Sequence, residues 1–348
     1  MNLNPVHEII AAGLTDRVFT AAVLKVDYSG EPIIHRAFGH RGDSDEEPVG
    51  KETLFDLASL TKVLATTPCW MILAGEIPGI LDRGLCSWVP RCPSDNRDIT
   101  PRLLLAHAAG LPAWRPYYLH RFDGSVSDAV LRKILGEQLD YPPGHGCIYS
   151  DLGFMLLAFL LEIETGMTLE ELARERVFKP LGLLDDLMFR PTCPPARPAL
   201  TRHGDPAGFV NDLNSRALGG MAGHAGLFGT ARGVSALFDE YRRSTVSGRG
   251  LFDRALSLEF FTRTAYAEGC TRALGFDTPS AQGSSGGSLF SPQSIGHTGF
   301  TGTSVWMDLR RQLSVVLLTN RVIMGEADQR IKAFRPRLHD AIVEGVLS

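Results

Sequence analysis

A serine and a lysine three positions apart carry the most informative chemistry in this chain. Ser59 and Lys62 lie in the stretch FDLASLTKV at residues 55–63. On a helix, side chains three apart share one face, with Cβ atoms roughly 5–6 Å apart. A serine hydroxyl is a poor nucleophile at neutral pH unless a nearby base accepts its proton. The spacing therefore predicts a nucleophile with an amine beside it, although an ordinary solvated helix start has the same spacing.

A tyrosine in a turn offers a second group for proton transfer. Tyr149 follows the turn PPGHG at residues 142–146 and precedes Ser150 and Asp151. A phenol whose proton is weakened by a nearby ammonium can relay protons between a serine, a lysine and a leaving group. The alternative is structural: Ser150 or Asp151 caps the following helix, and Tyr149 packs at its start.

A glycine-rich segment near the end of the chain completes a possible acyl-transfer site. Residues 296–304, GHTGFTGTS, contain His297, Thr298, Gly299 and Phe300. Glycines allow a substrate to approach the backbone closely, and N–H groups of an edge strand can stabilise an oxyanion. A glycine-rich strand start or a bulge is the simpler alternative.

The elements that must position these residues are strands at both ends of the chain. Residues 21–28 and 33–39 predict a hairpin, and residues 303–309 and 313–319 predict a second one. A final helix is expected over residues 327–346. We therefore expect an antiparallel sheet built from both chain ends and flanked by helices.

The middle of the chain is mostly helical, and helical periodicity is found at residues 62–74, 128–138, 151–164 and 169–178. The predicted fold is a single α/β (α+β) domain over residues 1–348. Its sheet-containing part comprises residues 1–58 and 285–348, and residues 59–284 form an inserted, largely helical part. We expect the site in the cleft between the two parts.

Composition and charge exclude several classes of function. The net charge of −4 provides no footprint for nucleic acid or an anionic membrane. The longest apolar run, residues 152–161, is about half the ~20 residues that span a bilayer. No secretory signal is visible, so we expect a cytoplasmic protein. Its six cysteines are then most simply free thiols, although Cys86 and Cys92 are near enough to pair under oxidising conditions. No metal or cofactor is expected, and the oligomeric state stays open.

The order of the three motifs resembles that of the penicillin-recognising serine hydrolases, which include serine β-lactamases, D-alanyl-D-alanine peptidases and related esterases. The resemblance is strongest to the class C β-lactamase and esterase branch. It extends over nearly the whole chain, through further similar segments at residues 18–26, 101–112, 218–228 and 317–321. It implies a β-lactamase/transpeptidase-like fold.

The resemblance also implies a mechanism. Ser59 would attack a carbonyl carbon after losing its proton to Lys62 or Tyr149, and the sequence does not decide between these bases. The N–H groups of Ser59 and Phe300 would hold the oxyanion, and Tyr149 would protonate the leaving group. His107 would satisfy backbone groups, whereas contact of His224 with a ligand is left open.

Two departures from the family pattern bear on the substrate. Asp151 stands where the family has an asparagine, and an ionised aspartate accepts but does not donate hydrogen bonds. Asp151 could also pair with Lys62 and raise its pKa. His297 replaces the lysine of K-T-G, whose fixed charge holds substrate carboxylates. Since histidine is mostly neutral at pH 7, His297, Thr298 and Gly299 are expected to bind a neutral ester.

Competing hypotheses remain for both the nucleophile and the function. Residues 283–287, GSSGG, match G-x-S-x-G but lack the strand before and helix after that a nucleophile elbow requires. Aligning residues 150–152 with the S-D-N element would put a leucine in the place of the amide. The expected function is esterase-like hydrolysis of a small ester, amide or β-lactam-like substrate. D-alanyl-D-alanine carboxypeptidase, β-lactamase, D-amino-acid amidase, a penicillin-binding sensor and an inactive scaffold are the alternatives.

Overall fold

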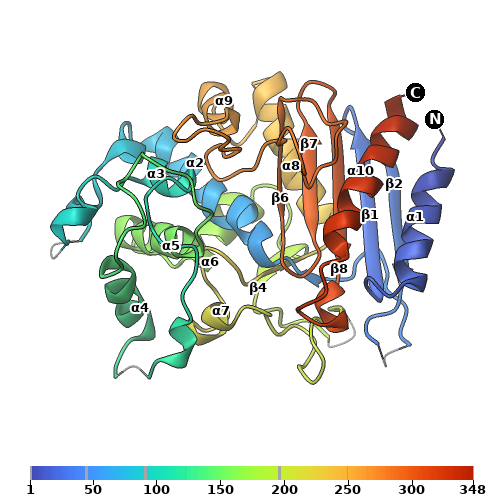
Figure 1. Cartoon of the computed structure of the whole chain (residues 1–348), viewed down its shortest axis with the longest axis horizontal. Helices are drawn as coiled ribbons and strands as arrows, with labels where there is room; N and C mark the ends of the chain where they lie inside the picture. Colours follow the sequence, from blue (N-terminus) through green and yellow to red (C-terminus); the bar gives the residue numbers. More distant parts are fainter. Residues whose placement is uncertain are drawn as a thin grey trace.

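The two ends of the chain build one antiparallel sheet. The computed structural model describes residues 2–43, 46–89, 92–121, 123–194, 197–248 and 250–347. Its five-stranded sheet has the order β2-β1-β8-β7-β6 (Figure 1). The strands are β1 (Ala21–Tyr28), β2 (Glu31–Gly39), β6 (Ser294–Thr298), β7 (Ser304–Asp308) and β8 (Leu313–Thr319). Both predicted hairpins are confirmed.

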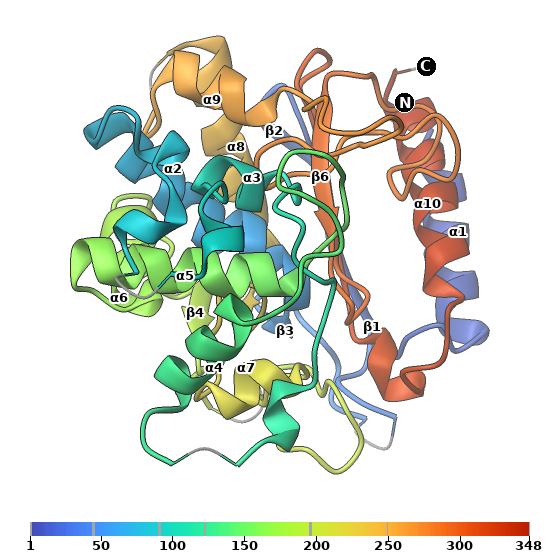
Figure 2. The same cartoon turned by 60° about the vertical axis from the view of Figure 1, so that its left-hand side comes forward.

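Helices cover both faces of this sheet. α1 (Asn4–Thr15) and α10 (Ile331–Leu347) lie together on one face, and α8 (Ala231–Val246) packs on the other against β1, β7 and β8 (Figure 2). Leu24 belongs to the core with α1 and α10, whereas its neighbour Val23 belongs to the core with α8. Because both faces are buried, β1 and β8 are almost continuously apolar rather than alternating.

The last helix starts later than the sequence predicts. α10 begins at Ile331, and the preceding residues form η8 (Arg321–Met324) and a loop. The Arg321 guanidinium donates to the carbonyl oxygens of Glu326 and Asp328, at 3.0 and 2.7 Å. These bonds hold the loop in a non-helical path, so the helix cannot begin at residue 327.

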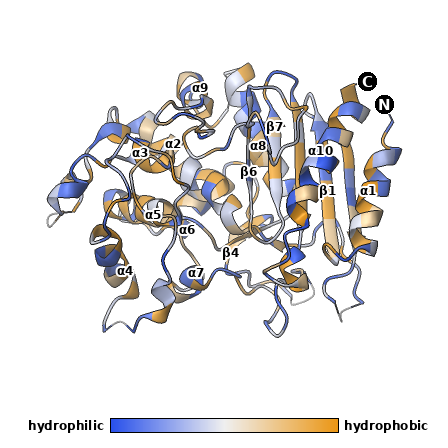
Figure 3. Ribbon diagram, in the orientation of Figure 1, coloured by the Kyte–Doolittle hydropathy of each residue, from blue (hydrophilic) through white to orange (hydrophobic). Residues whose placement is uncertain are grey.

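The central part of the chain is helical, as predicted, and its helices are rich in apolar residues (Figure 3). Many of these residues are buried in one hydrophobic core. The apolar run at residues 152–161 is buried within α5, whose first turn is capped by Ser150 accepting from the Gly153 N–H at 3.2 Å. The helices here are α2 (Thr67–Glu76), α3 (Pro101–Leu105), α4 (Val126–Leu135), α5 (Asp151–Thr165), α6 (Leu169–Ala173), α7 (Leu213–Ala217) and α9 (Arg254–Phe261), with shorter turns η2 (Lys62–Thr66), η3 (Ile80–Asp82), η4 (Leu85–Ser87), η5 (Ser94–Asn96), η6 (Tyr117–Leu119) and η7 (Arg174–Phe178).

A three-stranded sheet lies in this central region, in the order β3-β5-β4: β3 (Phe55–Asp56), β5 (Leu227–Gly229) and β4 (Leu187–Phe189). The division into sheet and helical parts stays a prediction, and α8 of the 59–284 segment packs on the large sheet. Among the described residues, no single helix is long and apolar enough to cross a membrane. Only α5 together with residues 169–178 meets that test, as a pair bent by 78°.

One buried asparagine ties the end of β8 to the start of β1. Asn320 is 2 % exposed, and its Oδ1 accepts from the N–H groups of Thr20 and Ala21 at 3.2 and 2.9 Å. Its Nδ2 donates to Thr20 Oγ1 and to the carbonyl oxygens of Arg41 and Leu200. One side chain therefore satisfies polar groups from three segments that meet at this edge.

Replacing Asn320 with alanine should destabilise the fold without touching the cleft. A buried polar group left without a hydrogen-bond partner costs about 1–3 kcal/mol of stability. Asn320→Ala leaves several such groups without their partner. We expect the free energy of unfolding in urea to fall by about 3 kcal/mol. Asn4→Ala, at an exposed asparagine, is the control. Equal urea midpoints for Asn320→Ala and the wild type would contradict this account.

Candidate active site

Ser59 sits on a tight turn that the glycine-rich segment holds in place. It lies in η1 (Ala58–Leu60), directly after β3, and Ala58 before it has a left-handed φ of 46°. Asp56 Oδ1 accepts from the Ala58 N–H at 2.9 Å, which stabilises this uncommon conformation. Thr301, after β6, donates its hydroxyl to the Asp56 carbonyl at 2.6 Å. The turn bearing Ser59 is therefore positioned from the far end of the chain.

Lys62 is a fully buried amine with three acceptors. Its Nζ lies 3.1 Å from Ser59 Oγ, 2.7 Å from Asp151 Oδ1 and 3.1 Å from the His224 carbonyl oxygen. The predicted contact between the Ser59 hydroxyl and the Lys62 amine is present, and so is the ion pair with Asp151. An ammonium has three N–H donors, and each has a partner here.

The charge on Lys62 depends on Asp151. Burial by itself lowers the pKa of the Lys62 amine, but the Asp151 carboxylate and Tyr149 outweigh it and raise that pKa. Burial raises the pKa of the Tyr149 hydroxyl; the Lys62 ammonium opposes this shift, and the Asp151 charge adds to it. Both groups therefore keep their protons at neutral pH in the free enzyme.

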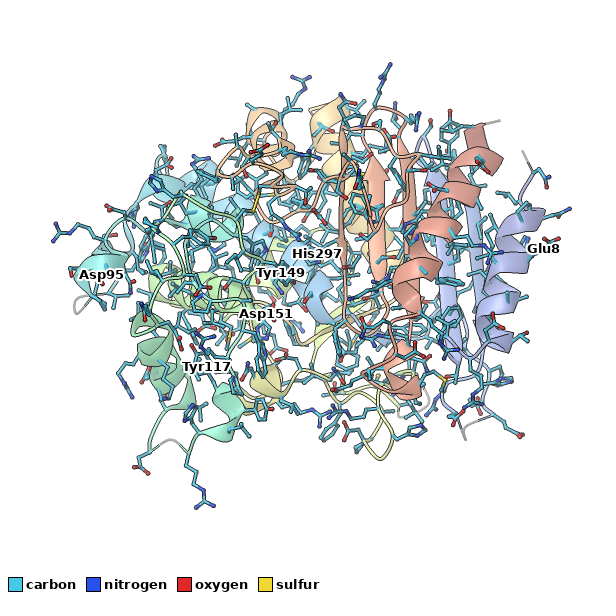
Figure 4. The ribbon with its side chains drawn as sticks, viewed as in Figure 1. Glu8, Asp95, Tyr117, Tyr149, Asp151 and His297 are labelled. Atoms are coloured by element: carbon cyan, nitrogen blue, oxygen red, sulfur yellow. A yellow bond between two sulfur atoms is a disulfide. The ribbon has the colours of Figure 1, made fainter. Side chains whose placement is uncertain are left out.

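Tyr149 is surrounded by aromatic rings and cations. Its hydroxyl interacts with Ser59 and Lys62. Its ring lies 4.6 Å from the His107 ring and 5.8 Å from the His297 ring, between centroids. The Arg272 guanidinium lies 5.1 Å from the Tyr149 ring centroid. Figure 4 shows Tyr149 beside Asp151 and His297 in the middle of the molecule.

His107 has the structural role that the sequence predicts. Its Nδ1 accepts from the Ser150 N–H at 3.0 Å, which fixes the start of α5 beside Tyr149. Burial, with the nearby positive charges of Arg272 and Lys62, holds the pKa of His107 well below 6.5. The ring is therefore neutral and acts as an acceptor.

His297 is neutral and buried at the position where the K-T-G motif of the resembled hydrolases has a lysine. Its Nδ1 lies 2.9 Å from the Thr298 carbonyl oxygen, which only accepts, so Nδ1 carries the proton. Burial and the positive charges of Lys62 and Arg272 hold the pKa of His297 well below 6.5. Nε2 has no hydrogen-bond partner among the described residues, so it offers a lone pair rather than a charge.

Gly299 allows the backbone after β6 to pass close to the Ser59 turn. A Cβ at this position would lie 2.6 Å from the Leu57 carbonyl oxygen and 2.1 Å from Thr303 Oγ1. Thr303 also donates to the Leu57 carbonyl at 3.1 Å. Only glycine therefore fits between the two segments.

A cleft of about 760 Å³ opens at these residues. Lys62 is buried behind it, and the other predicted site residues line it: Ser59, Tyr149, Asp151, His297, Thr298, Gly299 and Phe300. His224, whose contact the sequence left open, also lines the cleft. Further lining residues that sequence reasoning missed are Asp212, Arg272 and Arg335.

Asp212 supports the segment that holds Lys62. Its Oδ1 lies 2.9 Å from His224 Nε2 and accepts from the Ser215 N–H at 2.7 Å, so it also caps α7. Burial opposes ionisation of Asp212, yet His224 and this N–H hold its pKa at about 2. An aspartate before a short helix signals a cap in the sequence, but nothing there indicates the pairing with His224.

The expectation of six free thiols is wrong for four of them. Cys86 pairs with Cys92, and Cys147 pairs with Cys270, with Cα atoms 5.0 and 6.0 Å apart. Cys147 and Cys270 are 123 residues apart, so only the fold brings them together. Disulfides persist mainly in oxidising compartments. The cytoplasmic location stays a prediction.

No group of three or more His, Cys, Asp or Glu side chains in the described ranges is arranged to hold a metal ion. The groups that meet at the cleft are Ser59, Lys62 and Tyr149. A hydroxyl within hydrogen-bond distance of an amine and a phenol, at the floor of a cleft, suits nucleophilic attack with proton relay.

The fold and the residues in the cleft are those of a serine hydrolase. The Beta-lactamase family model matches residues 6–335, and the chain belongs to this family. A protein of Escherichia coli (strain K12) named "Putative D-alanyl-D-alanine carboxypeptidase" is 30% identical over 322 residues, covering 81% of this chain and 73% of that protein.

Solved structures show the same fold. EstCE1, described as a hydrolase with promiscuous acyltransferase activity, has a TM-score of 0.79 at 23% identity, covering 97% of each chain. The octameric penicillin-binding protein homologue from Pyrococcus abyssi has a TM-score of 0.77 at 17% identity, covering 99% of this chain and 78% of that one. The predicted β-lactamase/transpeptidase-like fold is confirmed.

The Cys147–Cys270 disulfide should contribute measurably to stability, since it closes a long loop beside Tyr149. Protein purified without reductant should show two free thiols on denaturation, Cys69 and Cys193, and six after reduction. Cys147→Ser/Cys270→Ser should lower the free energy of unfolding by about 2–4 kcal/mol, whereas Cys193→Ser should not. Six reactive thiols before reduction would refute the pairing.

Proposed function

We propose that this β-lactamase-family hydrolase forms an acyl-enzyme at Ser59 and acts on a carboxylic ester. The observation that carries the proposal is the 3.1 Å contact between Ser59 Oγ and the buried Lys62 Nζ at the floor of the cleft. The G-x-S-x-G serine, Ser285, lies instead in a loop near α10, where its carbonyl oxygen is 3.1 Å from His339 Nδ1.

Acylation begins with the loss of one proton from the Lys62–Tyr149 pair. Their pKa values are raised, so the resting pair is protonated and accepts no further proton. Once one proton has left, the pair accepts the Ser59 proton as Oγ attacks the ester carbon. Tyr149, which contacts both Ser59 and Lys62, then passes that proton to the leaving alkoxide.

In this mechanism the backbone N–H groups of Ser59 and Phe300 donate hydrogen bonds to the oxyanion of the tetrahedral intermediate. Preorganised backbone donors of this kind are worth about 10²–10³ in rate. Expulsion of the alcohol leaves the acyl group on Ser59. Water then attacks the acyl carbon, gives its proton to the same pair, and releases the carboxylic acid with the Ser59 hydroxyl restored.

The neutral His297 favours an ester without a carboxylate next to the scissile bond. Its Nε2 lone pair can accept a hydrogen bond but cannot form an ion pair. The Lys62 ammonium is paired with Asp151, so it is not a free cation for a substrate carboxylate.

A second candidate is a D-alanyl peptidase, and one observation favours it. Arg272 lines the cleft 5.1 Å from the Tyr149 ring and offers a cation for a C-terminal carboxylate. The E. coli relative carries the name of such a carboxypeptidase. Arg272 lies 3.6 Å from Asp277, which partly neutralises it, so we rank this function second.

Ser59→Ala should abolish hydrolysis of p-nitrophenyl butyrate because it removes the proposed nucleophile, the serine hydroxyl 3.1 Å from Lys62 Nζ. Ser285→Ala, at the G-x-S-x-G serine, is the matched control and should retain wild-type rates. The mass of the enzyme should increase by one acyl group with the ester. If a D-alanyl-D-alanine peptide or a β-lactam acylates the enzyme faster than the ester does, the esterase assignment is wrong. Activity in Ser59→Ala would show that Ser59 is not the nucleophile.

Asp151→Asn should shift the rising limb of the pH profile of kcat/KM to lower pH. The Asp151 charge raises the pKa of both Lys62 and Tyr149, so its removal eases loss of the required proton from either group. We expect a shift of about 1–2 pH units. Asp277→Asn removes a cleft carboxylate that pairs with Arg272 and should leave the limb in place. A shift of Asp151→Asn to higher pH would contradict the assignment.

A further inference from the structure

A buried arginine contacts the back of the peptide group that carries the Phe300 N–H. Arg335 lies in α10 and is 6 % exposed. Its Nη2 donates to the carbonyl oxygens of Gly299 and Thr303, at 2.7 and 2.8 Å. The Gly299 carbonyl and the Phe300 N–H belong to the same peptide group. Arg335 is therefore bonded to one end of the unit whose other end is the predicted oxyanion donor.

Planarity of the peptide group transmits this contact to the N–H. In a trans peptide the C=O and N–H bonds point in opposite directions, and the unit is rigid. Holding the Gly299 oxygen toward α10 therefore directs the Phe300 N–H away from α10. Within the described residues, this N–H has no hydrogen-bond acceptor, and Gly299 and Phe300 both line the cleft. The donor is thus oriented and left free for a ligand.

A second guanidinium holds the next peptide group. Arg321 Nε donates to the Phe300 carbonyl oxygen at 2.7 Å, and its guanidinium lies 4.3 Å from the centre of the Phe300 ring. The peptide groups on both sides of the Phe300 Cα are therefore bonded to arginines. Rotation of the Gly299–Phe300 peptide would break the Arg335 contact, so the orientation is fixed without help from substrate.

Arg335 also supplies charge. No carboxylate forms an ion pair with it in the part of the chain that the structure describes. Burial, and then the charge of Arg321, lowers the pKa of Arg335 to about 9, which leaves it protonated at pH 7. A cation bonded to a carbonyl oxygen polarises the amide and strengthens its N–H as a donor. The same charge stabilises an oxyanion on the other side of the peptide.

We propose that Arg335 is a positioning residue for the acyl-transfer reaction, which orients and polarises the Phe300 N–H of the oxyanion hole. It acts through the Gly299–Phe300 peptide group, to whose carbonyl oxygen its guanidinium is bonded. The proposal rests on the proposed function, in which that N–H binds the oxyanion. It assigns to α10 a part in transition-state stabilisation, in addition to covering the sheet.

The test compares Arg335→Met, Arg335→Lys and the control Arg337→Met, which removes an exposed arginine of the same helix. The readouts are kcat and KM for p-nitrophenyl butyrate and the inhibition constant of a simple boronic acid. Boron accepts the Ser59 oxygen and places a negatively charged oxygen in the oxyanion hole. Thermal unfolding identifies variants that fail to fold.

We expect Arg335→Met to reduce kcat about 10- to 100-fold with little change in KM, and to weaken boronate binding by a similar factor. Arg335→Lys should recover part of both because its ammonium keeps the charge. Arg337→Met should match the wild type. If Arg335→Met does not fold, the proposal is tested by the boronate affinity of Arg335→Lys. A weaker affinity than that of the wild type supports the proposal.

Unchanged boronate affinity in any folded Arg335 variant would overturn the proposal and leave Arg335 a purely structural residue. This outcome is distinct from failure of the proposed function. If Ser59→Ala retains ester hydrolysis, the nucleophile is wrong. If Ser59→Ala is inactive and Arg335→Met equals the wild type, the nucleophile stands and only the role of Arg335 falls.

Discussion

The structure of the site depends on the burial of one ammonium group. Lys62 is fully buried, and an unpaired charge in such a place would carry a penalty of several kcal/mol. Three acceptors remove that penalty: Ser59, Asp151 and the His224 carbonyl. They come from the turn after β3, the start of α5 and the loop before β5. Displacing any one of these segments would remove one of the three acceptors from the buried amine. The need to compensate the Lys62 charge therefore fixes the positions of the three segments relative to one another.

The same requirement gives Asp151 two opposing effects on Lys62. A carboxylate compensates the buried ammonium more completely than an amide, but it also keeps the proton on Lys62. The carboxylate that stabilises the buried Lys62 ammonium therefore also makes it harder for Lys62 to lose a proton and act as a base. The adjacent Tyr149 moderates the conflict, because its hydroxyl interacts with both Ser59 and Lys62 and shares the proton that must leave. The pair, rather than either residue, is the unit that titrates.

The sequence predicted features that local pattern determines. Apolar strands and turns revealed both hairpins, and the spacing of Ser59 and Lys62 was sufficient because both lie on one helical face. Partners far apart in the chain were missed. Cys147 and Cys270 are 123 residues apart, and Arg335 meets Gly299 only because α10 folds back across the sheet. Single residue types such as Arg or Cys carry no local signal for such contacts, so only the three-dimensional structure reveals them.

The distribution of charge around the cleft follows from the neutral His297. The cationic side chains described above are Lys62 beside the nucleophile and Arg272 at the Tyr149 ring. Arg335 and Arg321 are bonded to the two peptide groups that flank the Phe300 Cα. Lys62, Arg335 and Arg321 are thus bonded to the nucleophile or to the backbone, where they favour charge that develops during the reaction over charge present in the ground-state substrate. Such an arrangement is consistent with the proposed neutral substrate, whose reacting carbonyl becomes anionic only in the transition state.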